Sequence, residues 1–212
     1  MKHLNTFIYA VLAGMSIAIG GVVFLSIDNK VLGSVFFSIG LFAVCTLGLN
    51  LYTGKVCYIF DNKLSYSLDV VNIWFGNLVG TAMVGYLMRA TRIAGIAEKA
   101  KAMCDTKLND SMLSIFILAI FCNIMIYFGV EAYKTNQHET GKYYGILFSI
   151  VVFIVSGYEH CIANMFYFSI ANVWSLHAVQ YLLVMTLGNL VGGVIFPLAK
   201  KLKNRSEQKV FA

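Results

Sequence analysis

Charged residues are scarce in this chain. They make up 12% of its 212 residues, whereas hydrophobic residues make up 59%. Ordinary globular proteins carry roughly 25% charged residues. This composition excludes a single soluble domain of this size, so the chain is expected to fold as an all-α protein in a lipid bilayer.

Motifs of several other protein classes are also missing. Pro197 is the only proline, so the paired Asn-Pro-Ala motifs of neutral-solute channels are absent. None of the five cysteines forms a C-x-x-C pair, which favours small buried thiols. No carboxylate has ligand spacing to His160 or His177, so neither a metal nor a cofactor is expected.

The net charge of +6 comes mostly from the ends and loops, as in "KKLKNRSEQK" at residues 200–209. Such a basic segment is typical of the cytoplasmic face beside anionic lipid and does not indicate nucleic-acid binding. Because six spans leave both ends on one side, we expect both termini in the cytoplasm of a multi-pass protein of the cell membrane.

A bilayer core needs roughly 20 apolar residues per helix. On this criterion the chain is one transmembrane domain, residues 1–212, with six spans at residues 6–27, 31–60, 68–90, 111–133, 142–170 and 175–199. The connection Thr91–Asp110 is the long one, and it is compatible with a surface helix.

The stretch "GNLVG" occurs at residues 76–80 and again at 188–192, in the third and the sixth span. Spans three apart cross in opposite directions, which predicts an inverted 3+3 repeat with halves at about residues 1–105 and 106–212. The glycines alone have a simpler explanation, because G-x-x-x-G lets two helices approach closely. Asn77 and Asn189 need polar partners in hydrocarbon, and backbone groups released by a broken helix would serve.

The second and fifth spans run for about thirty residues, too long for a straight crossing, and polar residues interrupt both. Non-helical backbone at this depth must be buried in protein or line a cavity, so both helices are predicted to break around a shared path. Glu159 and Asn164 are expected to support the break, Glu159 by capping backbone amides. His160 is expected on the path, since imidazole exchanges protons near neutral pH.

At these residues the chain resembles the formate/nitrite transporter family of pentameric anion channels. The resemblance covers nearly the whole chain, from the first span to the sixth. Its motifs are "LYTG" (51–54), "FGNLVG" (75–80), "CNIMIYFGV" (122–130), "SGYEHCIANMFYF" (156–168) and "TLGNLVGG" (186–193).

The resemblance implies an aquaporin-like homopentamer in which every subunit has its own pore. It implies that Thr53 and His160 face one another, that Lys107 lies near the outer end, and that Asn77 and Asn189 hold the broken segments. Tyr52 stands where the family usually has phenylalanine, which predicts a slightly more polar constriction. The residues that match the family's two apolar constrictions are Phe37, Leu41, Leu51, Tyr52 and Phe153.

The predicted function is a channel or transporter for small monovalent weak-acid anions, proton-linked through His160, with lipid, anions and protons as its partners. Formate and nitrite come first, and hydrosulfide in the same family stays open. A neutral-solute channel of the water or glycerol type is the alternative from another class. An enzyme is not expected, because the consecutive residues Glu159, His160 and Cys161 point apart and do not converge on one substrate.

Overall fold

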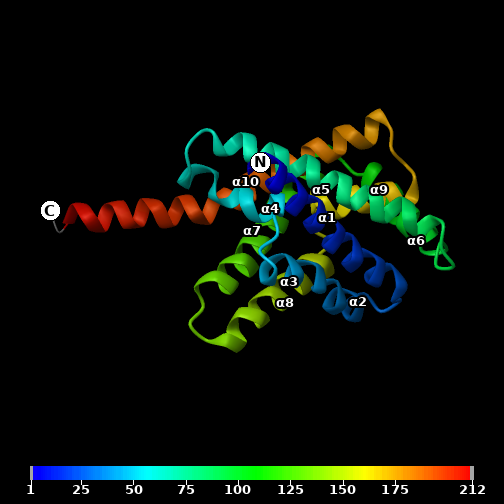
Figure 1. The fold of residues 1–212 in the computed structure, drawn as a ribbon, viewed down its shortest axis with the longest axis horizontal. Helices are drawn as coiled ribbons and strands as arrows, with labels where there is room; N and C mark the ends of the chain where they lie inside the picture. Colours follow the sequence, from blue (N-terminus) through cyan, green and yellow to red (C-terminus); the bar gives the residue numbers. More distant parts are fainter. Residues whose placement is uncertain (1, 211–212) are drawn as a thin grey trace.

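The computed structural model describes residues 2–210, apart from the side chains of residue 205 and residues 207–210. Within these residues all regular structure is helical (Figure 1). The elements in chain order are α1 (Lys2–Ser26), α2 (Lys30–Phe37), α3 (Ile39–Thr46), α4 (Tyr52–Lys55), the 3₁₀ helix η1 (Val56–Asp61), α5 (Tyr66–Arg89), α6 (Ile96–Leu108), α7 (Met112–Thr135), α8 (Glu139–Val155), α9 (Cys161–Ala171) and α10 (Leu176–Val210).

Among the described residues, four helices are long and apolar enough to cross a membrane, namely α1, α5, α7 and α10. They coincide with four of the predicted spans, which is what runs of about 20 apolar residues require. The predicted surface helix between residues 91 and 110 is confirmed as α6. The C-terminal part of α10 extends beyond the other helices (Figure 1).

The two remaining predicted spans are each divided into shorter helices. In 31–60 helix α3 ends at Thr46 and α4 begins at Tyr52, whereas in 142–170 helix α8 ends at Val155 and α9 begins at Cys161. The interruptions predicted within these two runs are therefore present at residues 47–51 and 156–160.

Both interruptions start with the same backbone turn. Gly48 has φ of +66° and Gly157 has φ of +74°, a left-handed conformation that glycine adopts without steric cost. In each case the next residue donates its N–H back to the last helical turn, Leu49 to the Val44 carbonyl and Tyr158 to the Phe153 carbonyl. This is the Schellman arrangement that ends α-helices.

The glycines of the repeated "GNLVG" stretch lie where helices touch. A Cβ atom on Gly80 of α5 would overlap the Val11 carbonyl oxygen of α1. A Cβ atom on Gly192 of α10 would overlap the Ile120 carbonyl oxygen of α7. The close-approach explanation of the glycines is thus confirmed, since α1 packs along α5 and α7 along α10.

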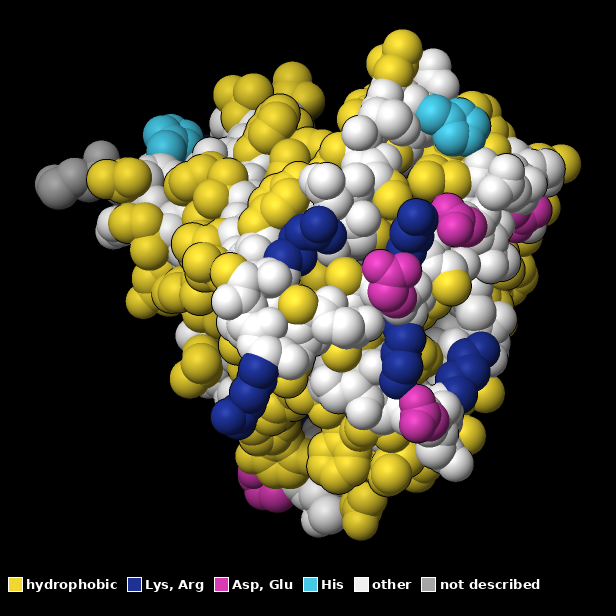
Figure 2. All heavy atoms as spheres, turned by 90° about the vertical axis from the view of Figure 1, so that its right-hand side faces the viewer, with side chains coloured by type: hydrophobic (Ala, Val, Ile, Leu, Met, Phe, Trp, Pro, Cys, Tyr) yellow, Lys and Arg dark blue, Asp and Glu magenta, His cyan; other side chains and the backbone are white. Residues whose placement is uncertain are grey.

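The outer surface suits a hydrophobic surrounding. Large apolar side chains are exposed around the helices, among them Leu68, Leu87, Leu113, Phe148 and Leu183. Figure 2 shows the end of the molecule on which α6 lies, where Lys, Arg, Asp and Glu side chains gather amid hydrophobic ones. Charged residues gathered at an end of the molecule and apolar residues along its sides fit a chain that crosses a bilayer.

Candidate functional site: a path between two interrupted helices

Thr53 and His160 meet where the two interruptions come together. Thr53 lies in the first turn of α4, and His160 is the residue that caps the start of α9. The Thr53 Oγ1 and His160 Nε2 atoms are 3.0 Å apart, and both residues are buried. The structure therefore brings together two side chains that are 107 positions apart in the sequence.

The hydrogen bonds of His160 define which ring nitrogen carries its proton. The Ala163 backbone N–H donates to His160 Nδ1 at 3.0 Å, so Nδ1 is an acceptor. In a neutral imidazole the other nitrogen carries the hydrogen, and His160 Nε2–H then donates to Thr53 Oγ1. The Thr53 hydroxyl hydrogen remains available to donate to a third group.

Asn77 holds the first interruption through backbone groups. Its Oδ1 accepts the N–H of Tyr52 at 2.8 Å, where α4 starts. Its Nδ2 donates to the carbonyls of Ala10 at 2.7 Å and Asn50 at 2.9 Å. Because a helix start leaves backbone N–H groups without helical partners, this side chain satisfies groups that the interruption exposes.

Asn189 makes the corresponding bonds at the second interruption. Its Oδ1 accepts the N–H of Cys161 at 2.9 Å, at the start of α9. Its Nδ2 donates to the carbonyls of Ala119 at 2.8 Å and Glu159 at 2.9 Å. The two asparagines of the repeated stretch thus have equivalent contacts in the two halves of the chain.

Glu159 has different partners from those expected. Its carboxylate accepts hydrogen bonds from Lys107 Nζ at 2.6 and 2.7 Å and from Asn164 Nδ2 at 2.8 Å. Among the described residues it accepts from no backbone amide, so the prediction that Glu159 caps the helix is wrong. The His160 ring does so instead, because its Nδ1 accepts the Ala163 backbone N–H at 3.0 Å at the start of α9.

Lys107 is therefore paired rather than free. It lies at the end of α6, and its side chain and that of Glu159 are 14% and 5% exposed. Asn164 completes the cluster and also donates to the His160 carbonyl at 3.0 Å. Its Oδ1 atom is buried and has no partner among the described protein groups, which leaves one acceptor of the cluster unsatisfied.

Two cavities lie next to the Thr53–His160 contact. The first, of about 110 Å³, is called the Lys107 cavity, and His160 and Asn164 line it. Its other lining residues are Phe24, Lys30, Phe37, Met103, Lys107, Phe153, Ile154, Gly157, Tyr158, Ala163 and Tyr167. The second, of about 130 Å³, is called the Lys55 cavity, and is lined by Val44, Cys45, Gly48, Leu49, Leu51, Gly54, Lys55, Val130, Tyr133 and Lys134.

The cavities lie toward opposite ends of the helices. Asn50, between two residues of the Lys55 cavity, donates its N–H to the Tyr9 carbonyl of α1. Phe24 of the same helix lines the Lys107 cavity. At 1.5 Å per residue Tyr9 and Phe24 are about 22 Å apart along α1. The Thr53–His160 contact therefore lies between the two cavities.

All five predicted constriction residues are buried. Phe37 and Phe153 line the Lys107 cavity with ring centroids 6.0 Å apart, and Phe153 also stacks on His160 at 5.8 Å. Leu51 lines the Lys55 cavity. Leu41 and Tyr52 line neither cavity and lie in the packed core.

The Tyr52 hydroxyl does not add the polarity that we expected at the constriction. It donates to the backbone carbonyl of Thr186 in α10 at 3.3 Å. Thr186 Oγ1 in turn accepts from the Trp74 indole N–H at 3.1 Å. The extra oxygen therefore ties α4 to α10, and sequence analysis missed Thr186 because no local pattern links it to Tyr52.

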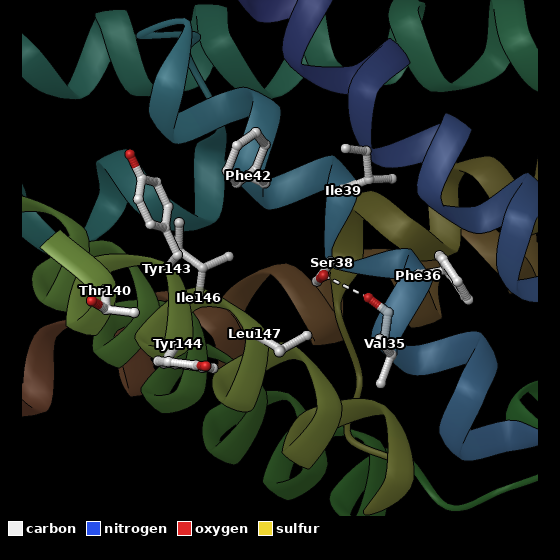
Figure 3. Close-up of a pocket in the computed structure, with 10 residues that line it drawn as sticks. All are labelled: Val35, Phe36, Ser38, Ile39, Phe42, Thr140, Tyr143, Tyr144, Ile146 and Leu147. Carbon is white, nitrogen blue, oxygen red and sulfur yellow. Dashed lines mark hydrogen bonds between the residues drawn. The ribbon is translucent and has the colours of Figure 1, made fainter.

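A larger pocket of about 370 Å³ lies away from this path, between α2, α3 and α8. Figure 3 shows its lining, in which Ser38 Oγ donates to the Val35 carbonyl at 2.6 Å. Phe36, Phe42 and Leu147 are among its mostly apolar residues, and no charged side chain lines it. Such a surface suits an apolar neighbour and offers nothing to hold an anion.

Comparison with known proteins identifies the family. A protein-family model described as "Formate/nitrite transporter" matches residues 1–200. This chain belongs to the formate/nitrite transporter family. Membership makes it a membrane channel or transporter, as its composition predicts.

Relatives with assigned names agree with this placement. A probable formate transporter of Methanothermobacter thermautotrophicus is 31% identical over 197 residues, covering 79% of this chain and 72% of that protein. The formate channel FocA of Haemophilus influenzae is 28% identical over 204 residues, covering 79% and 71%. A solved structure described as "Pentameric formate channel with formate bound" matches with a TM-score of 0.81 and 25% identity, over 96% of this chain and 98% of that one.

Proposed function

We propose that this protein carries small monovalent weak-acid anions, formate or nitrite foremost, across a cell membrane together with protons. The observation that carries the proposal is the buried contact of 3.0 Å between Thr53 and His160, with a cavity on either side. Thr53 and His160 would both touch the substrate. Phe37 and Phe153 would narrow the path on one side of this contact. On the other side the path would be narrowed by Leu41, Leu51 and Tyr52.

The apolar rings determine which form of the substrate crosses. Removing a carboxylate-sized ion from water costs several kcal/mol even after the protein relaxes. The neutral acid avoids most of this cost, and loss of hydration itself favours protonation of the anion. We therefore infer that the anion takes up a proton from the aqueous side as it loses hydration, and crosses the rings as the neutral acid or while sharing that proton.

His160 acts in this scheme as a neutral hydrogen-bond donor. Its Nδ1 is occupied by the Ala163 N–H, so the ring offers its single proton through Nε2. Thr53 extends that bond toward the substrate. Lys107 lies at the mouth of the path in its pair with Glu159, and that pair, with Asn164, keeps the segment before α9 in position.

We further propose an aquaporin-like arrangement of six membrane segments in two inverted halves, with the second and fifth segments broken. The equivalent contacts of Asn77 and Asn189 support it. The related solved channel is described as pentameric, which supports a homopentamer in which each subunit has its own path. The basic segment at residues 200–209 supports cytoplasmic termini.

Uptake into proteoliposomes tests the function. Formate, nitrite, hydrosulfide and lactate are offered outside vesicles whose lumen is more alkaline than the medium. The neutral acid releases its proton inside, so the gradient is expected to drive accumulation of formate or nitrite above that in protein-free vesicles. Indifference to all four anions would overturn the proposal, above all if the same vesicles swell rapidly in water or glycerol.

A further inference from the structure

The Lys55 cavity contains two cationic side chains. Lys55 is half-buried at the end of α4, and Lys134 is exposed in the last turn of α7. They share a cavity of about 130 Å³ with eight other residues, none of which is acidic. An excess of positive charge therefore faces a small enclosed space.

No carboxylate of the described residues lies within ion-pair distance of these two charges. Among the described side chains neither lysine forms a salt bridge. Glu131, one helical turn before Lys134, is already engaged by Lys200 at 2.9 Å and the Tyr58 hydroxyl at 2.9 Å. The Lys134 Nζ atom lies 3.8 Å from the centre of the Tyr58 ring, which holds the ammonium group without cancelling its charge.

The other cavity differs in this respect. Lys107 is in contact with both carboxylate oxygens of Glu159, and Lys30 donates to the Val155 carbonyl at 3.0 Å. A buried ion pair of this kind attracts an incoming anion weakly, because the carboxylate repels it as the ammonium attracts it. Among the described residues the Lys107 cavity thus has one ammonium without a carboxylate partner, that of Lys30, whereas the Lys55 cavity has two.

The cavity that the two lysines line borders the central contact on the Lys55 side. Lys55 is two residues after Thr53. Leu51 and Gly54, which flank Thr53 in the sequence, are both part of the cavity wall. Val44, Leu49 and Val130 supply apolar walls, which lower the local dielectric and strengthen attraction of an anion. An anion held there would be the next occupant of the Thr53–His160 position.

We propose that Lys55 and Lys134 form a binding site for a small monovalent anion at this mouth of the path. The proposal rests on the proposed function and adds a second charged site to it. Two ammonium groups provide several hydrogen-bond donors, and the volume suits anions of the size of formate, nitrite or chloride. A cation is repelled from the same space.

Cys45 provides a reporter inside this cavity. It lines the Lys55 cavity, is half-buried and is a free thiol, whereas the other four cysteines are buried. Methanethiosulfonates transfer a thioalkyl group to a thiolate and release methanesulfinate. Two reagents are compared, the anionic sulfonatoethyl methanethiosulfonate and the cationic trimethylammonioethyl methanethiosulfonate. Peptide mass spectrometry measures the rate at which each modifies Cys45. Each rate is divided by the rate of the same reagent with free mercaptoethanol.

The anionic reagent is expected to react faster with wild-type protein in proteoliposomes, and millimolar formate or chloride should slow it. A unit charge at roughly 8 Å in a partly aqueous medium changes each rate about threefold in opposite directions. Lys55→Gln and Lys134→Gln should therefore each lower the anionic-to-cationic ratio about tenfold. Lys63→Gln is the matched control, since Lys63 is exposed in the loop after η1 and lines neither cavity.

Three results would overturn the anion site: a normalised ratio of one or below, equal ratios in the Lys55, Lys134 and Lys63 variants, or no reaction at Cys45. These outcomes are distinct from failure of the proposed function. Vesicles that take up none of the four anions but keep the charge preference at Cys45 would refute the transport proposal alone. Normal uptake without that preference would refute this site alone.

Discussion

Replacing Asn189 with alanine is expected to destabilise the start of α9. The side chain is fully buried and makes three hydrogen bonds, accepting from the Cys161 N–H and donating to the carbonyls of Ala119 and Glu159. Alanine removes all three bonds and leaves the Cys161 N–H and the Glu159 carbonyl without a partner, whereas the Ala119 carbonyl keeps its helical bond within α7. The equivalent change Asn77→Ala does the same at the start of α4.

The magnitude follows from the number of groups left unsatisfied. Each buried backbone group without a hydrogen bond costs roughly 1–3 kcal/mol, which gives about 2–6 kcal/mol for two. Water entering the vacated space would compensate some of this loss, so we expect the lower half of that range. In chains of this size about 1 kcal/mol corresponds to roughly 2–4 °C in unfolding temperature, and the expected fall is on the order of 10 °C.

Circular dichroism of the purified protein in detergent, at one heating rate, measures the apparent unfolding temperature. The matched control is Asn72→Ala on the same helix as Asn77, because Asn72 makes one exposed hydrogen bond, to the His3 carbonyl at 3.0 Å. That control should lose no more than about 3 °C. A loss for Asn77→Ala or Asn189→Ala no larger than the control's would refute the idea that these side chains hold the interruptions.

Three further substitutions test other contacts. Glu159→Gln leaves the Lys107 ammonium buried without a counter-charge and should lower the free energy of unfolding by about 3–5 kcal/mol. The double variant with Lys107→Met should recover part of this loss. A Glu159→Gln variant as stable as wild type would contradict the pairing. Tyr52→Phe loses only the bond to the Thr186 carbonyl, so unfolding should shift by about 1 kcal/mol with uptake retained; abolished uptake would show that the hydroxyl contacts the substrate. Phe153→Ala removes the ring between Phe37 and His160 and should raise lactate uptake relative to formate; an unchanged ratio would exclude Phe153 as the size limit.

The parts of the fold that were predictable are those with local causes. Apolar runs of sufficient length located α1, α5, α7 and α10, because crossing a bilayer fixes a minimum length. Polar residues inside two overlong runs located the interruptions, and the repeated stretch indicated that both halves hold them in the same way. The Thr53–His160 contact was expected from family resemblance, since nothing near either residue indicates the other.

What could not be predicted depends on contacts between distant segments. Glu159 accepts a hydrogen bond from Lys107, which is 52 positions away in α6. No local pattern links that helix to the start of α9. The direction of the Tyr52 hydroxyl depends on how α10 passes α4. Lys55 was noticed only as a polar interruption, and its cavity forms only when the end of α7 packs beside α4.

The central claim is that a substrate passes the Thr53–His160 contact through hydrogen bonds to it and crosses the apolar rings together with a proton taken up from the aqueous side. The most direct measurement is formate uptake driven by a pH gradient, compared between wild type and His160→Asn in proteoliposomes of matched protein content. Asparagine retains an acceptor suited to the start of α9 but loses the bond to Thr53, so the unfolding temperature should fall by only a few degrees. Loss of one buried hydrogen bond to the substrate should cost its passage about 1–3 kcal/mol. Gradient-driven uptake should therefore fall about tenfold or more. A His160→Asn variant with full proton-coupled uptake would contradict the account.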